Sequence, residues 1–169
     1  MKINVWSYKE EYKSIKKQIL KEVDKVFSSG QLILGKNVKF LEHNFSNYLK
    51  LKYGIGVNSG TDAIQIALMS AKIGKDDEVI TTSNTAVPTV SAIVSCGAKP
   101  VFVDINKDDY LIDVDKIKEV INKKTKAIIP VNLYGQCADY DKILPIAKKN
   151  KFIVIEDCAQ STGSFYNNK

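Results

Sequence analysis

The stretch Ile153-Val154-Ile155-Glu156-Asp157-Cys158-Ala159-Gln160 decides how the rest of this chain is interpreted. An apolar run from Phe152 to Ile155 ends in two carboxylates, which small and polar residues follow. Buried parallel strands are continuous apolar runs, and ligands of such sheets bind beyond the carboxyl ends of the strands. The stretch therefore indicates a strand that presents Asp157 to a ligand, although two acids at this place also suit a cap of the next segment.

A second stretch, Val57-Asn58-Ser59-Gly60-Thr61-Asp62-Ala63, has the composition of a phosphate-binding turn between a strand and a helix. Gly60 lets a ligand approach the backbone, and the first N–H groups of a helix attract an anion. The hydroxyls of Ser59 and Thr61 add donors. The alternative is an ordinary helix N-cap. Because the turn is neither a Walker motif nor G-x-G-x-x-G, nucleoside triphosphates and NAD are disfavoured.

The two stretches matter most as a pair. One offers a place for a phosphate, and the other offers Asp157 with Gln160 three residues later. A phosphorylated pyridine requires both features, because a carboxylate beside the ring nitrogen keeps it protonated and the protonated ring withdraws electrons from carbanions. The pair therefore predicts a site for pyridoxal phosphate.

Hydrophobic periodicity predicts an alternation of helices and strands along the chain. The predicted helices are 11–27, 36–49, 61–71, 88–95, 114–121 and a last one that Asp139 or Asp141 caps and that reaches Asn150; the predicted strands are 53–57, 78–81, 100–103, 127–133 and 152–155. This order is typical of βαβ units. We therefore predict an α/β fold with a mostly parallel sheet, helices on both of its faces, and no linker or repeat.

The apolar loop 31–35 is expected to pack in a local core, and the less favoured alternative makes it a wall of a binding site. The first helix is expected to end at Ser28-Ser29-Gly30, and His43 is expected to be solvated.

Composition and charge exclude several classes of protein. The chain has 169 residues, 44% of them hydrophobic, and a formal net charge of +6. Its lysines are dispersed among acids, so we expect an anionic small molecule rather than a nucleic acid as ligand. The three cysteines form no close pairs and the only histidine is His43, so neither a metal site nor a disulfide framework is expected. No signal peptide or membrane-spanning run is visible, which predicts a cytoplasmic protein.

Several motifs in a fixed order carry a resemblance to a known family. The chain is similar to the first part of the DegT/DnrJ/EryC1/StrS family of pyridoxal-phosphate-dependent nucleotide-sugar aminotransferases. The motifs are Ser29-Gly30-Gln31-Leu32-Ile33-Leu34-Gly35, Asn58-Ser59-Gly60-Thr61-Asp62-Ala63, Gly74-Lys75-Asp76-Asp77-Glu78-Val79-Ile80-Thr81, Ala98-Lys99-Pro100-Val101-Phe102-Val103-Asp104, Leu133-Tyr134-Gly135-Gln136 and Glu156-Asp157-Cys158-Ala159-Gln160.

The resemblance implies a fold and a reaction. Residues 1–169 would form the N-terminal portion of the pyridoxal-phosphate-binding large domain of a fold-type I enzyme, and the small C-terminal domain would be absent from this fragment. The parent would be a homodimer that transfers an amino group, with glutamate as donor, to a nucleotide-linked keto sugar for polysaccharide biosynthesis. The stretch Ser83-Asn84-Thr85-Ala86-Val87-Pro88-Thr89 resembles the branch that acts on dTDP-3-oxo-6-deoxyhexoses.

The resemblance also assigns residues. Gly60 and Thr61, beside Ser59, would hold the cofactor phosphate, Asp157 would pair with the pyridine nitrogen, and Gln160 would contact the phenolic oxygen. Two positions depart from the family. Many relatives have a ring-stacking aromatic residue near Ala86, and relatives often have a histidine where this chain has Asn132.

The family's catalytic lysine binds the cofactor covalently and moves a proton between two carbons. It follows Ser-Phe in the pattern S-F-x-x-x-K, which Ser164-Phe165-Tyr166-Asn167-Asn168-Lys169 fits. We interpret this match as coincidental, because in relatives the motif follows the aspartate strand only after a further turn and strand. The catalytic lysine is therefore expected beyond Lys169. Two alternatives stay open: a sugar dehydratase of the same family with histidine in place of the lysine, and a catalytically inactive truncated chain.

Overall fold

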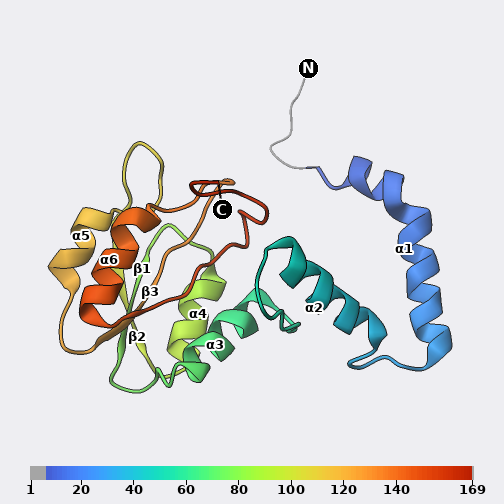
Figure 1. Ribbon diagram of the computed structural model, residues 1–169, viewed down its shortest axis with the longest axis horizontal. Coiled ribbons are helices and arrows are strands. Elements are labelled where there is room, and N and C mark those ends of the chain that lie inside the picture. The colour runs from blue at the N-terminus through green and yellow to red at the C-terminus, as the bar shows by residue number, and fades with distance from the viewer. Residues whose placement is uncertain (1–6, 169) are drawn as a thin grey trace. The chain divides into compact units, whose positions relative to one another are not determined.

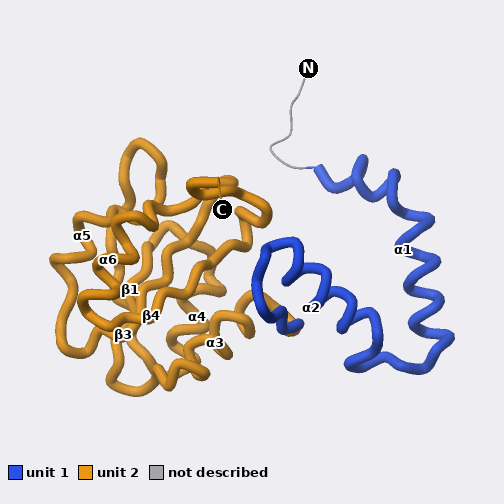
Figure 2. Tube along the Cα trace, viewed as in Figure 1, with its two compact units in different colours: residues 1–56 blue, residues 57–169 orange. Residues whose placement is uncertain are grey.

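The computed structural model describes residues 7–168. The chain divides into two compact units, residues 1–56 and residues 57–169 (Figure 2). The sequence predicts an extended segment over residues 1–10, and most of that segment lies outside the described residues. That residues 1–169 are one portion of a cofactor-binding large domain stays a prediction, and each unit is described here by itself.

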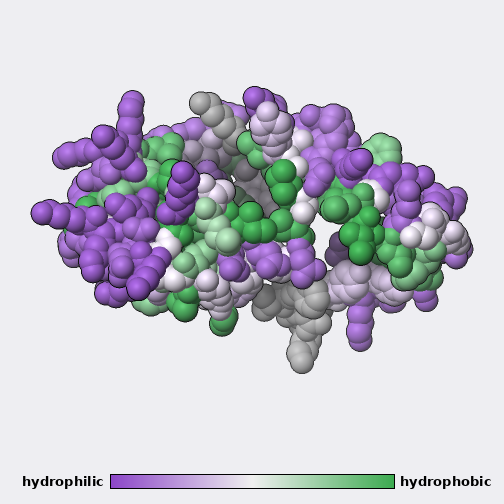
Figure 3. Space-filling view, turned by 90° about the horizontal axis from the view of Figure 1, so that it is seen from below, coloured by the Kyte–Doolittle hydropathy of each residue, from purple (hydrophilic) through white to green (hydrophobic). Residues whose placement is uncertain are grey.

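The first unit consists of helix α1, Lys9–Ser29, and helix α2, Lys36–Tyr48. Both helices were predicted. Gly30 ends α1 with φ at +69°, a left-handed conformation that glycine adopts without the steric cost of a Cβ. No residue of α1 is buried, and Ser46 is the one buried residue of α2. The helices of this unit therefore leave apolar faces at the surface, and Figure 3 shows hydrophobic residues there.

The loop between α1 and α2 does not pack in a core. Leu32, Ile33 and Leu34 are 61%, 85% and 75% exposed. The preferred prediction for this loop was wrong because two helices with a short connection supply too few apolar neighbours to enclose three large side chains. His43 is exposed, as predicted, and its ring lies 2.9 Å from the amide of Asn47.

The strand predicted at 53–57 is absent, because a strand exists only where another strand completes its hydrogen bonds. No described strand pairs with this segment. Instead the N–H of Gly56 donates to Glu42 Oε1 at 2.8 Å. A Cβ on Gly54 would collide with the backbone carbonyl of Glu42, so glycine permits this close approach. The segment is extended, but a side chain takes the place of a neighbouring strand.

The second unit is a parallel sheet flanked by helices (Figure 1). Its strands are β1 (Glu78–Thr82), β2 (Lys99–Val103), β3 (Thr125–Ile129) and β4 (Ile153–Val154), in the spatial order β2-β1-β3-β4 with every pair parallel. Its helices are α3 (Gly60–Ser70), α4 (Val87–Ser95), α5 (Val114–Val120) and α6 (Tyr140–Asn150). The predicted α/β fold is confirmed.

Two separate hydrophobic cores confirm that helices cover both faces of the sheet. Successive side chains of a strand point to opposite faces. Ile80 and Ile128 accordingly contribute to the core under α5 and α6, whereas Val79 and Ala127 contribute to the core under α3 and α4. Figure 1 shows the two pairs of helices on opposite sides of the strands. Asp139, one of the two predicted caps, accepts the N–H of Lys142 at the start of α6.

The last two strands are shorter than predicted. Strand β3 ends at Ile129, because Pro130 has no N–H for the ladder. Pairing between these strands then resumes as a single bridge between Val131 and Asp157. The chain beyond β4 therefore still pairs with the sheet at Asp157, the carboxylate that is predicted to bind a ligand.

Candidate cofactor site

Asp157 lies just beyond the carboxyl end of β4, as predicted, and its backbone is held on both sides. Its N–H donates to the C=O of Pro130 at 3.1 Å, and its C=O accepts the N–H of Asn132 at 2.9 Å. These two bonds extend the parallel ladder past the end of the regular strands. The position of the Asp157 Cα is thereby fixed at the carboxyl edge of the sheet, where α/β proteins bind ligands.

The carboxylate of Asp157 is held by a buried hydroxyl. Thr89, which is fully buried in the first turn of α4, donates from Oγ1 to Asp157 Oδ2 at 2.7 Å. Thr85 Oγ1 lies 2.7 Å from the same Thr89 oxygen. The other carboxylate oxygen, Oδ1, accepts the N–H of Ala159 at 3.3 Å. Sequence reasoning did not find Thr89; its only signal was a polar residue on the inner side of an apolar helix.

Gln160 is held by the loop that follows β3. The N–H of Gly135 donates to the Gln160 C=O at 3.0 Å, and the N–H of Tyr134 reaches Gln160 Oε1 at 3.4 Å. Gly135 has φ at +76°, which suits glycine. The loop 132–135 therefore contacts both Asp157 and Gln160, the two residues predicted to bind the cofactor ring.

Asn132, the position where relatives often have histidine, is the centre of a buried polar network. Its side chain is 1% exposed. Oδ1 accepts the N–H of Ala138 at 2.9 Å and the hydroxyl of Tyr140 at 3.0 Å, while Nδ2 reaches Cys158 Sγ at 3.4 Å. Burial raises the pKa of Tyr140 far above its ordinary range, so its hydroxyl stays protonated and donates. Burial also raises the pKa of the Cys158 thiol, which therefore stays neutral beside Asp157.

The turn Ser59-Gly60-Thr61 forms the N-terminus of α3, as predicted. Ser59 is the N-cap: its hydroxyl accepts the N–H of Asp62 at 3.1 Å and donates to Asp62 Oδ2 at 2.9 Å. No hydrogen bond among the described residues uses the N–H of Gly60 or Thr61. A Cβ placed on Gly60 would meet nothing within 4 Å, so space is open there. These unpaired donors fit a phosphate.

Helix α3 packs against α4 in the same compact unit as Asp157. Cys96, just after α4, donates from Sγ to the C=O of Gln65 in the middle of α3 at 3.5 Å, and its own carbonyl lies beside Gly74 beyond the end of α3. Helix α4 follows β1, so its N-terminus, which carries Thr89, lies at the carboxyl edge of the sheet. That the turn at Gly60 serves the same ligand as Asp157 stays a prediction.

Ala86 precedes α4 and lines an open cavity of about 510 Å³. The other lining residues come from the preceding turn, the outer side of α4 and β2: Ser83, Thr85, Val87, Val90, Ser91, Val94, Ser95 and Phe102. No aromatic side chain occupies position 86, where many relatives have one. The cavity lies on the side of α4 that carries Val87, Val90 and Val94, and none of the residues predicted to bind the cofactor lines it.

The end of the described chain folds back on the loop before α6. Ser164 Oγ donates to the C=O of Gly135 at 2.8 Å, and the Tyr166 hydroxyl donates to Asp139 Oδ1 at 3.1 Å. The Tyr166 ring also packs edge-on against Tyr140, with centroids 5.6 Å apart. Lys169 lies outside the described residues. The segment before it is made of turns and bends rather than a strand.

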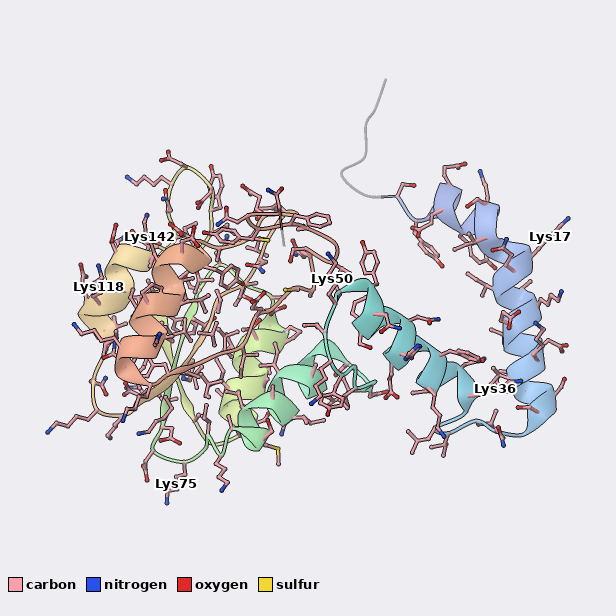
Figure 4. All side chains as sticks on the ribbon, viewed as in Figure 1. Lys17, Lys36, Lys50, Lys75, Lys118 and Lys142 are labelled. Carbon is pink, nitrogen blue, oxygen red and sulfur yellow. The ribbon has the colours of Figure 1, made fainter. Side chains whose placement is uncertain are left out.

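The positive charge of the protein is spread over many elements. Ion pairs with neighbouring acids offset part of it, as between Lys142 and Asp139 at 3.0 Å. No group of three or more potential metal ligands occurs among residues 7–168, and no helix there is long and apolar enough to span a bilayer. Figure 4 labels lysines that project from both units: Lys17, Lys36, Lys50, Lys75, Lys118 and Lys142.

A parallel sheet flanked by helices, with a carboxylate held just beyond its strands, defines an α/β domain with the edge at which such proteins bind ligands. The comparison with known proteins is more specific. Residues 13–169 match the DegT/DnrJ/EryC1/StrS aminotransferase family, and the chain belongs to that family. The resemblance predicted from the motifs is confirmed.

Named relatives act on nucleotide sugars. A dTDP-3-amino-3,4,6-trideoxy-alpha-D-glucose transaminase from Micromonospora megalomicea subsp. nigra is 47% identical over 95% of this chain and 43% of its own length. The crystal structure of S. venezuelae DesV with a ketimine intermediate superposes with a TM-score of 0.93 at 33% identity, covering 96% of this chain and 44% of that one.

A third relative has another reaction. The crystal structure of a GDP-4-keto-6-deoxymannose-3-dehydratase with a trapped PLP-glutamate geminal diamine gives a TM-score of 0.80 at 29% identity, covering 99% of this chain and 42% of that one. The chain spans less than half the length of these three proteins. Both reactions considered from the sequence therefore occur among proteins similar to this chain, and the dehydratase structure contains pyridoxal phosphate.

Proposed function

We propose that the protein to which this chain belongs is a pyridoxal-phosphate-dependent aminotransferase that acts on a nucleotide-linked keto sugar. The observation that supports this most is the position of Asp157. Thr89 holds its carboxylate at the carboxyl edge of the sheet, and in the same compact unit the N–H groups of Gly60 and Thr61 are unpaired. A fixed negative charge for a ring nitrogen and donors for a phosphate are the two requirements of this cofactor.

The residues of this chain have distinct roles in the proposal. The N–H groups of Gly60 and Thr61 and the Thr61 hydroxyl bind the phosphate, while Ser59 holds the helix end in place through Asp62. Asp157 holds a proton on the ring nitrogen, and Gln160 donates to the phenolic oxygen through its amide N–H₂, since its Oε1 faces the Tyr134 N–H. The bound cofactor supplies an electron sink for the amino-transfer chemistry. The proton-transferring lysine is proposed to lie beyond Lys169.

The substrate proposal rests on the relatives. The dTDP-sugar transaminase named above favours a dTDP-3-oxo-6-deoxyhexose as the acceptor, and we propose glutamate as the amino donor. The dehydratase is the second candidate, favoured by the structural match to that enzyme.

We also propose that the active protein is a cytoplasmic homodimer. Helix α1 buries no side chain, and the loop after it exposes Leu32, Ile33 and Leu34. An exposed apolar surface of this kind is costly in water and is typical of an interface. A second copy of the protein supplies a matching apolar surface, and size-exclusion chromatography with light scattering would measure the mass directly.

The test of the function uses the full-length protein. Purified protein is mixed with pyridoxal phosphate, then with glutamate, and finally with a dTDP-3-oxo-6-deoxyhexose, while absorbance and product mass are recorded. An aminotransferase converts the cofactor to its amine form with glutamate and then yields an amino sugar. A product that has lost a hydroxyl group identifies the dehydratase. Failure to bind pyridoxal phosphate would refute both reactions.

A further inference from the structure

The proposed function uses Thr89 only as a support of its central carboxylate and gives Thr85 no role. Thr89 is fully buried on the inner side of α4, and its Oγ1 lies 2.7 Å from both Asp157 Oδ2 and Thr85 Oγ1. Thr85 itself is half-buried in the turn before the helix. The three side chains thus form a continuous chain from the protein surface to the carboxylate.

The number of protons that each group can donate sets the direction of these hydrogen bonds. An ionised carboxylate only accepts hydrogen bonds, and a hydroxyl has a single proton to donate. Thr89 must therefore donate to Asp157, and its remaining lone pairs accept from Thr85. The Thr85 hydroxyl is accordingly the donor in the pair of threonines. A bond to a charged acceptor is stronger than one between neutral groups, so the Thr89 bond governs the direction of the carboxylate.

The backbone bonds of Asp157 fix its Cα but not its side-chain torsions. The N–H and C=O of Asp157 bind Pro130 and Asn132, and only side-chain contacts decide where the two carboxylate oxygens point. Oδ2 is held by Thr89 at 2.7 Å, whereas Oδ1 has only the longer contact of 3.3 Å with the Ala159 N–H. The two oxygens are therefore not equivalent: Oδ2 is firmly held by a buried hydroxyl, whereas Oδ1 has one long contact and is freer to accept a strong donor.

We propose that Thr89 is a positioning residue for the cofactor: the relay Thr85–Thr89 turns the Asp157 carboxylate so that Oδ1 faces the protonated ring nitrogen. This inference rests on the proposed function, since it requires pyridoxal phosphate in the site. Thr89 does not touch the cofactor and acts through Asp157. Its β-branched side chain has restricted χ1 rotation, which keeps the hydroxyl directed at the carboxylate.

The test measures the ring nitrogen itself. Full-length protein is loaded with pyridoxal phosphate labelled with ¹⁵N in the ring, and the ¹⁵N chemical shift is followed as pH rises. T89V replaces the hydroxyl by a methyl group of nearly the same size, T89S keeps the hydroxyl as a matched control, and T85V removes the outer donor. The dissociation constant for the cofactor is measured for each variant.

We expect the unsubstituted protein and T89S to keep the nitrogen protonated to the same pH. In T89V the nitrogen should lose its proton at a pH at least about one unit lower, with about tenfold weaker cofactor binding, because a carboxylate that is no longer held toward the nitrogen stabilises the nitrogen's proton less. T85V should shift in the same direction by a smaller amount. A purely structural role of Thr89 would lower thermal stability and leave the nitrogen titration unchanged.

The outcomes separate this inference from the function. An unchanged nitrogen titration in T89V overturns the relay, while a protein that still binds pyridoxal phosphate with a protonated nitrogen retains the function. If T89V does not fold, T85V decides, and an unshifted titration in T85V overturns the relay. If the unsubstituted protein binds no pyridoxal phosphate, the proposed function fails and the relay fails with it.

Discussion

Replacing Asn132 by alanine should destabilise the protein more than any surface substitution, because Asn132 satisfies several buried groups at once. Its Oδ1 accepts the N–H of Ala138 at 2.9 Å and the hydroxyl of Tyr140 at 3.0 Å. Ala138 is fully buried, and Tyr140 is 6% exposed. In N132A both donors lose their acceptor in a place that water does not reach, so each loses a hydrogen bond without compensation.

The magnitude follows from the number of donors left unpaired. A buried donor without a partner costs about 1–3 kcal/mol, so two of them give about 2–6 kcal/mol in N132A. The loss is a large part of the total stability of a typical domain, which is about 5–15 kcal/mol. Y140F is the control: it removes one donor and leaves Asn132 paired with Ala138, so it should cost only about 0.5–1.5 kcal/mol.

The assay is equilibrium urea unfolding followed by far-UV circular dichroism, applied to the unsubstituted protein, N132A, Y140F and the double variant. The loss in free energy of unfolding in the double variant should be smaller than the sum of the losses in the two single variants, because Y140F removes one of the donors that N132A leaves unpaired. If N132A costs no more than Y140F, or if the two effects simply add, the network around Asn132 does not have the role assigned to it.

Two further predictions concern pH and packing. A hydrogen bond from Asn122 at 2.6 Å, and the nearby Lys99, hold the pKa of Glu78 below its ordinary value of 4.5. Ionised Glu78 therefore stabilises the fold above that pH, and the effect is lost as pH falls through the lowered pKa. In E78Q the free energy of unfolding should depend less on pH below about pH 4.5 than in the parent, and an unchanged pH dependence would contradict this assignment. I128A, at a fully buried strand position, should lower the free energy of unfolding in urea by about 2–5 kcal/mol. I153A, at a position that is 46% exposed, should lower it clearly less, and equal losses would argue against the described core.

Much of the fold was predictable from the sequence because it depends on local features. Apolar periodicity and turn residues placed the helices within a few residues of their observed ends, and Gly30 and Asp139 end and begin helices as predicted. The alternation of elements predicted the parallel sheet. The strand at 53–57 was predicted wrongly because strand formation depends on a partner elsewhere in the chain, which no local pattern reveals.

The candidate site likewise has features that local sequence predicts and features that depend on contacts between distant residues. The sequence by itself determined the family, the fold class, the helix N-terminus at Gly60 and the strand end before Asp157, because turn geometry and strand ends are encoded within a few residues. Only the tertiary structure decided how these groups are held. Thr89 reaches Asp157 across 68 residues of sequence, and Asn132 reaches Cys158 across 26. Such contacts follow from strand order and helix direction, which bring distant residues to one edge of the sheet.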